Sequence, residues 1–505
     1  MTNPLYDTLF KQHQGKTTVF LELADGTVFT HRDFLELAAK YAHVFTQLGV
    51  KPGERVAVQI EKSPQALAIY AACVQAGIVF LPLNTAYTAD EVSYFVENSG
   101  ARVVLCDGKR SEALAPIAKA SGALLETMHS DGSGSFAVRA EAMASAFSTV
   151  ERSEDDLAAF LYTSGTTGRS KGAMLSQGNL LSNCKALVTE WAFTSDDVLL
   201  HALPIFHTHG LFVATNIALL ADSKIIFMPK FDVDVIIAQM PRATTMMGVP
   251  TFYTRLLDDK RFTKELAQHM RLFISGSAPL LAETHVQFEK RTGHRILERY
   301  GMTETNMNTS NPYTGERRAG TVGFPLPGVE VKITDSKTGA TLPQGEIGEI
   351  EVRGPNVFKG YWQMPEKTAE ELREDGFFIT GDLGQIDEDG YLHIVGRNKD
   401  LIISGGYNIY PKEIELLLDE VDGVLESAVV GVPHPDFGET VVGILVAEAD
   451  AQLDLDAIQK NIVTSLARFK HPQKLIVVPE LPRNTMGKVQ KKALREQYKG
   501  LFTPV

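Results

Sequence analysis

The sequence predicts an α/β protein with a large N-terminal domain of parallel-sheet α/β layers plus β segments, followed by a small α+β domain. Strand and helix patterns alternate over residues 55–106. After about residue 340, glycines and acidic residues separate short β segments, and a compact unit begins near residue 400. A chain of 505 residues is also long enough for more than one domain.

The segment 55–106 carries the clearest local signals. Ser63 followed by Pro64 predicts the start of one helix, and Thr88 with Glu91 forms a capping box for a second. The order β-α-β-α-β predicts a parallel sheet with crossover helices. The predicted elements are a strand at 55–60, a helix ending at Gly77, a strand at 78–83, a helix at 89–99 that Gly100 ends, and a strand at 102–106.

Residues 130–136, SDGSGSF, contain glycines spaced as in a dinucleotide-binding loop. That motif requires a strand before it and a helix after it. The sequence around 130–136 favours neither element, so we interpret the segment as a polar loop.

The C-terminal part predicts short β segments at 345–354 and 373–397, joined by tight turns. The composition changes at 396–400, which gives predicted domains of residues 1–398 and 399–505. The second domain is expected to contain a helix at 412–423, strands at 426–434 and 441–449, a helix at 456–469 and a last strand at 474–479.

Composition limits the function. The net charge of −13 argues against a broad nucleic-acid surface or an anionic membrane as partner. Three widely spaced cysteines, Cys73, Cys106 and Cys184, do not indicate disulfides or zinc. The first residues lack the features of a signal peptide, and no apolar stretch is long enough to span a bilayer. We therefore expect a cytoplasmic protein.

The most informative stretch is YTSGTTGRSKG at 162–172, directly after the apolar segment LAAFLY. Its glycines allow backbone N–H groups to point inward, and its hydroxyls and cations suit a polyphosphate. It is not a Walker A loop, because Ser170 precedes Lys171 and a glycine follows. A solvated Ser/Gly turn is the alternative interpretation.

This stretch resembles the signature loop of the adenylate-forming superfamily, which includes acyl-CoA synthetases, luciferases and the adenylation domains of peptide synthetases. Six further motifs follow in the family order, and together the seven span nearly the whole chain. They are PIFHTHG (204–210), SGSAPL (275–280), RYGMTET (299–305), ITGDLG (379–384), GRNKDLIISGGYNIYPKEIE (396–415) and PRNTMGKVQK (482–491).

The resemblance implies a two-step reaction with ATP, Mg²⁺ and coenzyme A. A carboxylate attacks the α-phosphate of ATP, which gives an acyl-adenylate and pyrophosphate, and the CoA thiol then displaces AMP. It also implies the ATP-binding residues of the phosphate loop, the adenine pocket and the ribose site. These are Thr163, Ser164, Gly165, Thr166, Thr167, Gly168, Lys171, Ser277, Ala278, Glu298, Arg299, Tyr300, Gly301, Asp382 and Arg397.

The resemblance further implies roles in catalysis. Lys488 matches the catalytic lysine, and acylation of it would remove its charge. Thr303 would contact the α-phosphate and Glu304 would bind Mg²⁺, although a helix-capping Thr/Glu pair has the same local pattern. His207 would lie at the wall of the acyl pocket. The alternative, a zinc site, has weak support, because HTH supplies only two histidines.

The second half-reaction involves the boundary between the domains. Lys399 matches the hinge about which the small, mobile domain of the relatives rotates. Gly405 and Gly406 would then line the tunnel for the pantetheine chain of CoA. A simple turn is the alternative interpretation of these two glycines.

Two arginines provide evidence on which carboxylic acid is the substrate. Arg255 and Arg299 occupy positions predicted to line the pocket, and a buried arginine requires an anion, from the protein or from the substrate. Residues 298–330 resemble malonyl-CoA synthetases, which implies a dicarboxylate substrate, malonate or methylmalonate. The predicted substrate-binding residues are Thr208, Arg255, Arg299, Met302 and Met307.

Other readings remain. A ligase for another short or medium-chain acid, or for long-chain acids, shares these motifs. An amino-acid adenylation domain would carry an Asp in the segment equivalent to PIFHTHG, which has none. A luciferase has no residue here in its favour. A non-catalytic protein of the same fold would be expected to lack Lys488, Glu304 or the TSGTTG loop.

Overall fold

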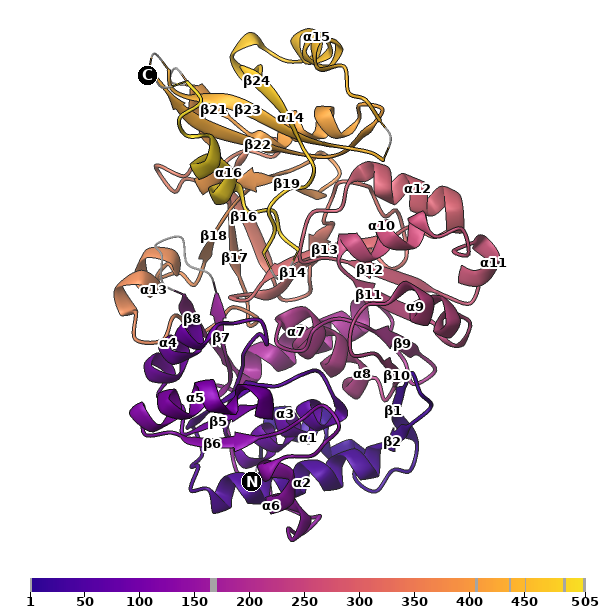
Figure 1. The fold of residues 1–505 in the computed structure, drawn as a ribbon, viewed down its shortest axis with the longest axis vertical. Coiled ribbons are helices and arrows are strands. Elements are labelled where there is room, and N and C mark those ends of the chain that lie inside the picture. Colours follow the sequence, from indigo (N-terminus) through magenta and orange to yellow (C-terminus); the bar gives the residue numbers. More distant parts are fainter. Residues whose placement is uncertain are drawn as a thin grey trace.

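The computed structural model describes residues 2–163, 170–404, 407–435, 437–449, 451–484 and 487–502. It confirms the predicted α/β class, with four sheets (Figure 1). Residues up to about 325 form the two larger sheets and their helices, a four-stranded sheet follows, and the last hundred residues form a separate body at the end of the long axis.

The first of the larger sheets has six strands, and all neighbours pair in parallel except β7 and β8. Its strand order is β6 (Leu124–Thr127), β5 (Val103–Cys106), β3 (Arg55–Gln59), β4 (Val79–Pro82), β7 (Leu157–Thr163) and β8 (Lys171–Ser176). Its helices are α2 (His31–Gln47), α3 (Pro64–Ala76), α4 (Ala89–Ser99), α5 (Gly108–Ala120) and α6 (Ser135–Glu141).

The helix signals read from this segment are confirmed. The Ser63 hydroxyl accepts a hydrogen bond from the Ala66 amide at the start of α3, and Gly77 ends that helix with φ +69°. Thr88 and Glu91 form both hydrogen bonds of the capping box of α4. Every residue of α3 except Gln65 is buried, because this helix is apolar on all sides and packs inside the molecule.

Residues 130–134 form a loop, as predicted, but the prediction that no strand precedes the segment and no helix follows it is wrong. Strand β6 precedes the segment, and α6 begins at Ser135. Both are weakly encoded: β6 is a partly exposed edge strand of four residues, and α6 has seven residues and no side-chain cap.

The second large sheet has nine strands, in the order β15 (Phe324–Pro325), β14 (Asn306–Ser310), β13 (Leu297–Met302), β12 (Leu272–Ser275), β11 (Thr245–Gly248), β9 (Val198–His201), β10 (Lys224–Phe227), β1 (Val19–Leu23) and β2 (Val28–Thr30). The strands from β13 to β1 run in parallel. The associated helices are α1 (Pro4–Leu9), η1 (Lys11–His13), α7 (Gln177–Glu190), η2 (His209–Thr215), α8 (Asn216–Leu220), α9 (Val233–Gln239), η3 (Met240–Arg242), α10 (Pro250–Asp258), α11 (Lys264–Ala267) and α12 (Ala282–Thr292).

One continuous core joins these two sheets through helices that pack between them. Val58 in β3, Ile69 in α3, Leu187 in α7, Ile217 in α8 and Leu199 in β9 all belong to it. Because the sheets are locked together in this way, the carboxyl ends of their strands stay in fixed relative positions, which is where ligands bind in open α/β sheets.

Two smaller sheets complete the fold. The four-stranded sheet comprises β16 (Glu330–Thr334), β17 (Gly348–Arg353), β18 (Phe378–Ile386) and β19 (Leu392–Arg397), with α13 (Pro365–Glu371) beside it. The last body contains β20 (Ile402–Ser404), β21 (Tyr407–Ile409), β22 (Val424–His434), β23 (Gly438–Ala447) and β24 (Lys474–Val478), with η4 (Asn398–Asp400), α14 (Pro411–Asp419), α15 (Leu455–Ser465), η5 (Arg468–Lys470) and α16 (Lys491–Tyr498).

The structure also bears on the cysteines and on membrane-spanning helices. The three cysteines are buried and unpaired. Within the described ranges, no helix combines the length and the apolar character needed to cross a bilayer.

A buried polar cluster ties the N-terminal segment to the nine-stranded sheet. The rings of His13 and His31 stack with centroids 4.1 Å apart, and both approach the same oxygen of Asp222, at 3.1 and 3.3 Å. The ring planes differ by only 10°, so the nitrogen lone pairs cannot converge on one ion, and Lys16 lies 2.7 Å from the other Asp222 oxygen. We interpret the cluster as polar packing rather than a metal centre.

This cluster predicts loss of stability in acid. Burial and the neighbouring His13 lower the pKa of His31 from 6.5 to about 4. The unfolded chain therefore binds a proton that the folded chain does not, and stability present above pH 6.5 is lost as the pH falls through 4, by about 3 kcal/mol at most. We expect the thermal midpoint of the parent to fall more between pH 7.5 and 5.0 than that of His31→Phe. The exposed His269→Gln is the matched control, and an equal pH dependence in His31→Phe would contradict the assignment.

Candidate active site

The predicted motifs meet at the carboxyl ends of β9, β12 and β13. His207 follows β9 and precedes the π-helical turn η2, Ser275 ends β12, and Arg299 and Tyr300 lie in β13. Neighbouring side chains of β13 point to opposite sides, so Arg299 faces Gly276 while Tyr300 faces the four-stranded sheet.

Arg299 is buried, with 4% of its surface exposed. Its Nε and Nη2 have no hydrogen-bond partner among the described residues. Burial lowers the pKa of Arg299 to about 9, so the charged guanidinium is destabilised unless an anion joins it. Gly276 makes room for this side chain, because a Cβ at that position would lie 2.3 Å from the Arg299 Cζ.

Two histidines lie on the same side as Arg299. Nδ1 of His209 lies 3.2 Å from the Ser277 hydroxyl, and Nε2 of His209 has no partner among the residues described. Burial, Arg299 and His207 lower the pKa of His209, and burial with Lys488 and Arg299 lowers the pKa of His207 to about 3. Both imidazoles are therefore neutral at pH 7, and the free nitrogen of His209 is available to an anion next to Arg299.

Asp382 forms the polar link to the four-stranded sheet. The Tyr300 hydroxyl donates to its Oδ2 at 2.6 Å, and Arg397 Nε lies 2.9 Å from its Oδ1. Asp382 is buried, whereas Arg397 remains partly exposed. Asp382 raises the pKa of Arg397, which stabilises the charged guanidinium.

Glu304 follows β13 and is also buried. Its Oε1 accepts a hydrogen bond from the Thr163 hydroxyl at 3.3 Å and lies 3.0 Å from the Tyr361 hydroxyl. No lysine or arginine within the described ranges lies at ion-pair distance from this carboxylate. Thr303 beside it is half-buried. This buried carboxylate is therefore open to a cation from outside the protein.

Lys488 reaches this region from the last body of the fold. It belongs to a tight turn in which the Lys488 amide donates to Asn484 Oδ1 at 2.9 Å, and Gly487 has φ +75°. Desolvation and Arg397 lower the pKa of Lys488, while Asp382 and Glu304 act in the opposite direction. Its side chain is exposed to solvent.

Lys171 occupies a different position from the one expected of a free phosphate-binding lysine. Its ammonium lies 3.1 Å from both carboxylate oxygens of Glu371 and 4.1 Å from the Tyr361 ring centroid. Contact of Lys171 with ATP therefore stays a prediction. Neither Glu371 nor Tyr361 was identified from the sequence.

Several predicted residues occupy other settings. Glu298 faces His285 of α12 at 3.6 Å. Gly301 lies against the Asn306 carbonyl, where a Cβ would be 1.9 Å away. Thr208 and Met307 are buried, Ala278 and Met302 are half-buried, and Lys399 is exposed. The residues outside the described ranges are Ser164, Gly165, Thr166, Thr167, Gly168, Gly405 and Gly406.

Only one of the two arginines predicted to line the acyl pocket is buried. Arg255 lies in α10 with an exposed side chain, because it occupies the polar face of an amphipathic helix. Arg299 alone is a buried arginine that needs an anion. A role of Arg255 in substrate binding stays a prediction.

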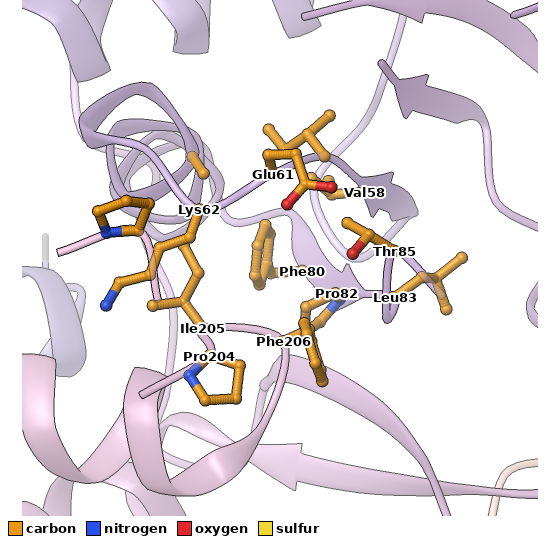
Figure 2. Close-up of a pocket in the computed structure, with 13 residues that line it drawn as sticks. Val58, Glu61, Lys62, Phe80, Pro82, Leu83, Thr85, Pro204, Ile205 and Phe206 are labelled. Atoms are coloured by element: carbon orange, nitrogen blue, oxygen red, sulfur yellow. The ribbon is translucent and has the colours of Figure 1, made fainter. Parts of the chain in front are cut away.

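A cavity of about 70 Å³ lies beside residues 204–206, which directly precede His207 in the sequence (Figure 2). Pro204, Ile205 and Phe206 line it from below, opposite Phe80. The stem of Lys62 follows its wall, and its amine donates to the His201 carbonyl at 2.8 Å, which explains why Figure 2 shows the nitrogen directed away from Phe80.

Comparisons with known proteins agree with this site. The family model described as AMP-binding enzyme matches residues 8–362, and the model described as AMP-binding enzyme C-terminal domain matches residues 413–488. A Malonate–CoA ligase of Arabidopsis thaliana is 38% identical over 482 residues, which are 89% of this chain and 78% of the relative.

Solved structures are similar over the whole chain. The crystal structure of ATP-bound MatB from Rhodopseudomonas palustris is 56% identical, with full coverage of both chains and a TM-score of 0.98. The apo structure of the same protein gives a TM-score of 0.87, also with full coverage of both chains. The arrangement seen here is therefore closer to the ATP-bound form, in agreement with Lys488 facing Glu304 and Asp382. With both family models matched in order along the chain, this protein belongs to the AMP-binding enzymes of the adenylate-forming superfamily.

Proposed function

We propose that this protein is an AMP-forming ligase that joins malonate to CoA through malonyl-adenylate. The single observation that carries the choice of acid is Arg299, a buried arginine whose Nε and Nη2 have no partner among the described residues. Such a group is costly in an apolar fatty-acyl pocket but binds a carboxylate in a bidentate manner. The relatives named Malonate–CoA ligase and MatB support the same choice.

In this proposal the carboxylate that is not activated lies on Arg299, with a second hydrogen bond from His209. A neutral imidazole can donate to an anion without adding a second buried charge. Ser277 orients His209 through Nδ1. Thr208, Met302 and Met307 would shape the space around the carbon between the two carboxylates, and the adaptable methionines suit methylmalonate as well.

The remaining groups suit ATP. The buried Asp382 would accept hydrogen bonds from the ribose hydroxyls, next to Arg397. Thr163 and Thr303 would contact phosphate oxygens, together with the loop at 164–168 and Lys171. Backbone groups at 277–278 and 298–301 would line the adenine pocket.

Glu304 fits a Mg²⁺ site, since a buried carboxylate surrounded by hydroxyl groups is the hard oxygen donor that this ion prefers. When bound with ATP, Mg²⁺ would neutralise phosphate charge. Glu304 and Thr163 are the residues that would face it.

The chemistry of the protein's own groups follows from charge. Attack of one carboxylate on the α-phosphorus brings two anions together, so donors placed in advance lower the barrier. Lys488 would supply its ammonium to the attacking carboxylate and to the α-phosphate oxygens. Acylation of Lys488 would remove that charge and block this step.

For the thioester step, we propose that residues 399–505 form a mobile domain that rotates at Lys399 relative to residues 1–398. Gly405 and Gly406 would then line the path of the pantetheine chain. The partners are thus small molecules, namely a dicarboxylate, ATP and CoA, with neither nucleic acid nor membrane, in the cytoplasm.

The Gly276 contact leads to a prediction about malonate binding. In Gly276→Ala the new methyl group would overlap Arg299, so the guanidinium must shift. We expect KM for malonate to rise at least about tenfold with little change in thermal stability. Gly500→Ala, whose Cβ meets no atom within 4 Å, is the control. An unchanged KM in Gly276→Ala would contradict the contact.

The proposed function is tested by AMP formation with ATP, Mg²⁺ and CoA across acetate, malonate, methylmalonate, succinate and octanoate. We expect malonate to give the highest kcat/KM and methylmalonate to follow. A preference for acetate, octanoate or another monocarboxylate would retain the AMP-forming mechanism and reject the dicarboxylate site.

A further inference from the structure

The hydroxyl of Tyr361 lies between two carboxylates. It is 2.6 Å from Oε2 of Glu371 and 3.0 Å from Oε1 of Glu304. Tyr361 and Glu304 are both buried, and Glu371 stands at the end of α13 with 21% of its side chain exposed. The three residues come from different parts of the chain, so the contact is made by the tertiary fold.

A neutral phenol has one proton to donate, and the shorter distance assigns it to Glu371. Among the described residues, Glu304 is then left with one longer hydrogen bond, from Thr163 at 3.3 Å. A carboxylate that is poorly supplied with donors is destabilised in a buried site and gains most from a cation. Glu371 therefore competes with Glu304 for the hydrogen bond that the Tyr361 hydroxyl can donate.

Glu371 can keep its own charge because two lysines face it. Lys171 lies 3.1 Å from both of its oxygens, and Lys367 lies 3.0 Å from Oε1. These cations are needed, since a carboxylate at the carboxyl end of a helix faces the negative end of the helix dipole. The charged Glu371 in turn remains a strong acceptor for the Tyr361 proton.

We propose that Glu371 is a positioning residue for the ATP-dependent step: it draws the Tyr361 proton away from Glu304 and so keeps the Glu304 carboxylate available for the divalent cation of ATP. Glu371 does not touch substrate or metal, and its influence passes through Tyr361. This inference rests on the proposed role of Glu304 as a metal ligand.

The test measures binding without catalysis. Mn²⁺ is titrated into the enzyme with the non-hydrolysable analogue α,β-methylene-ATP, and free Mn²⁺ is followed by electron paramagnetic resonance. In Glu371→Ala the phenol proton turns to Glu304, and we expect about tenfold weaker Mn²⁺ binding. Tyr361→Phe should bind Mn²⁺ within about twofold of the parent, and adding Glu371→Ala to Tyr361→Phe should cause no further loss. If the loss in Glu371→Ala persists in the double variant, the route through Tyr361 is wrong.

Further variants separate the remaining outcomes. In Glu371→Gln a neutral amide replaces the charged acceptor, so the phenol proton should turn to the charged Glu304 and Mn²⁺ binding should weaken as in Glu371→Ala. Parent-like Mn²⁺ affinity in Glu371→Gln would overturn the proposal even if Glu371→Ala did not fold. Glu370→Ala, which removes only an exposed contact with Lys367, is the matched control. Glu304→Gln should itself weaken Mn²⁺ binding. Unchanged Mn²⁺ binding in Glu304→Gln would reject both the metal site and this inference. The Mn²⁺ titrations do not depend on which acid the enzyme activates.

Discussion

Replacing Lys488 with alanine is expected to lower the rate of acyl-adenylate formation by about 10³-fold while leaving most of the thioester-forming rate intact. Lys488 is the cation that the last body of the fold brings toward Glu304 and Asp382. Its charge matters where a carboxylate approaches a phosphate, and it is not needed when a thiol attacks an adenylate already formed. The two steps are measured separately, by malonate-dependent exchange of pyrophosphate with ATP and by CoA consumption with synthetic malonyl-adenylate.

The expected asymmetry distinguishes a catalytic charge from a structural one. Lys492→Ala is the matched control, because Lys492 is an exposed lysine four residues away on α16. Lys488→Gln should behave as Lys488→Ala does, since the amide has similar length but no charge. Equal losses in both half-reactions would indicate damage to the domain rather than loss of a charge, and full exchange activity in Lys488→Gln would reject the role.

The parts of this fold that the sequence predicts best are those encoded within a few residues. The start and end of α3 depend on Ser63, Pro64 and Gly77, and each signal acts over one helical turn. The order of strands and helices then implies a parallel sheet, whose strand ends collect the functional loops. The same reasoning fails at β6 and α6, where short, partly exposed elements carry little apolar pattern.

The site divides in the same way. Family motifs identify Lys488, Glu304, Asp382 and Arg299 as single residues, but they do not say which atoms meet. The contact of Tyr361 with Glu304 joins residues 57 positions apart, and that of Lys171 with Glu371 joins residues 200 apart. No local pattern reports such distances. Because Lys171 follows a Gly-rich loop, its sequence position predicts a phosphate contact. In the fold it forms an ion pair with Glu371 instead.

Arg299→Ala is expected to lower kcat/KM for malonate by about 10²–10³-fold, because a buried charge pair that loses one partner costs about 3–5 kcal/mol. The variant Arg299→Leu should also improve the activity toward a monocarboxylate of similar length, such as butyrate, relative to malonate. An apolar side chain removes the cost of leaving the guanidinium unpaired when the substrate has no second carboxylate. Steady-state AMP formation with both acids measures the change in specificity.

A general loss of activity would not show that Arg299 recognises the second carboxylate. The test is therefore the change in kcat/KM for malonate relative to butyrate. Arg295→Ala, at an exposed arginine just before β13, should change neither rate by more than about twofold. Arg255→Ala decides the separate prediction for the exposed arginine of α10: a loss specific to malonate would place it in the site, and parent-like kinetics would leave Arg299 as the sole cation. If Arg299→Leu lowered the rates with malonate and butyrate equally, Arg299 would serve the fold of β13 and Gly276 rather than recognition of a dicarboxylate. A reversal of preference from malonate to butyrate would support binding of the second carboxylate of malonate by the guanidinium.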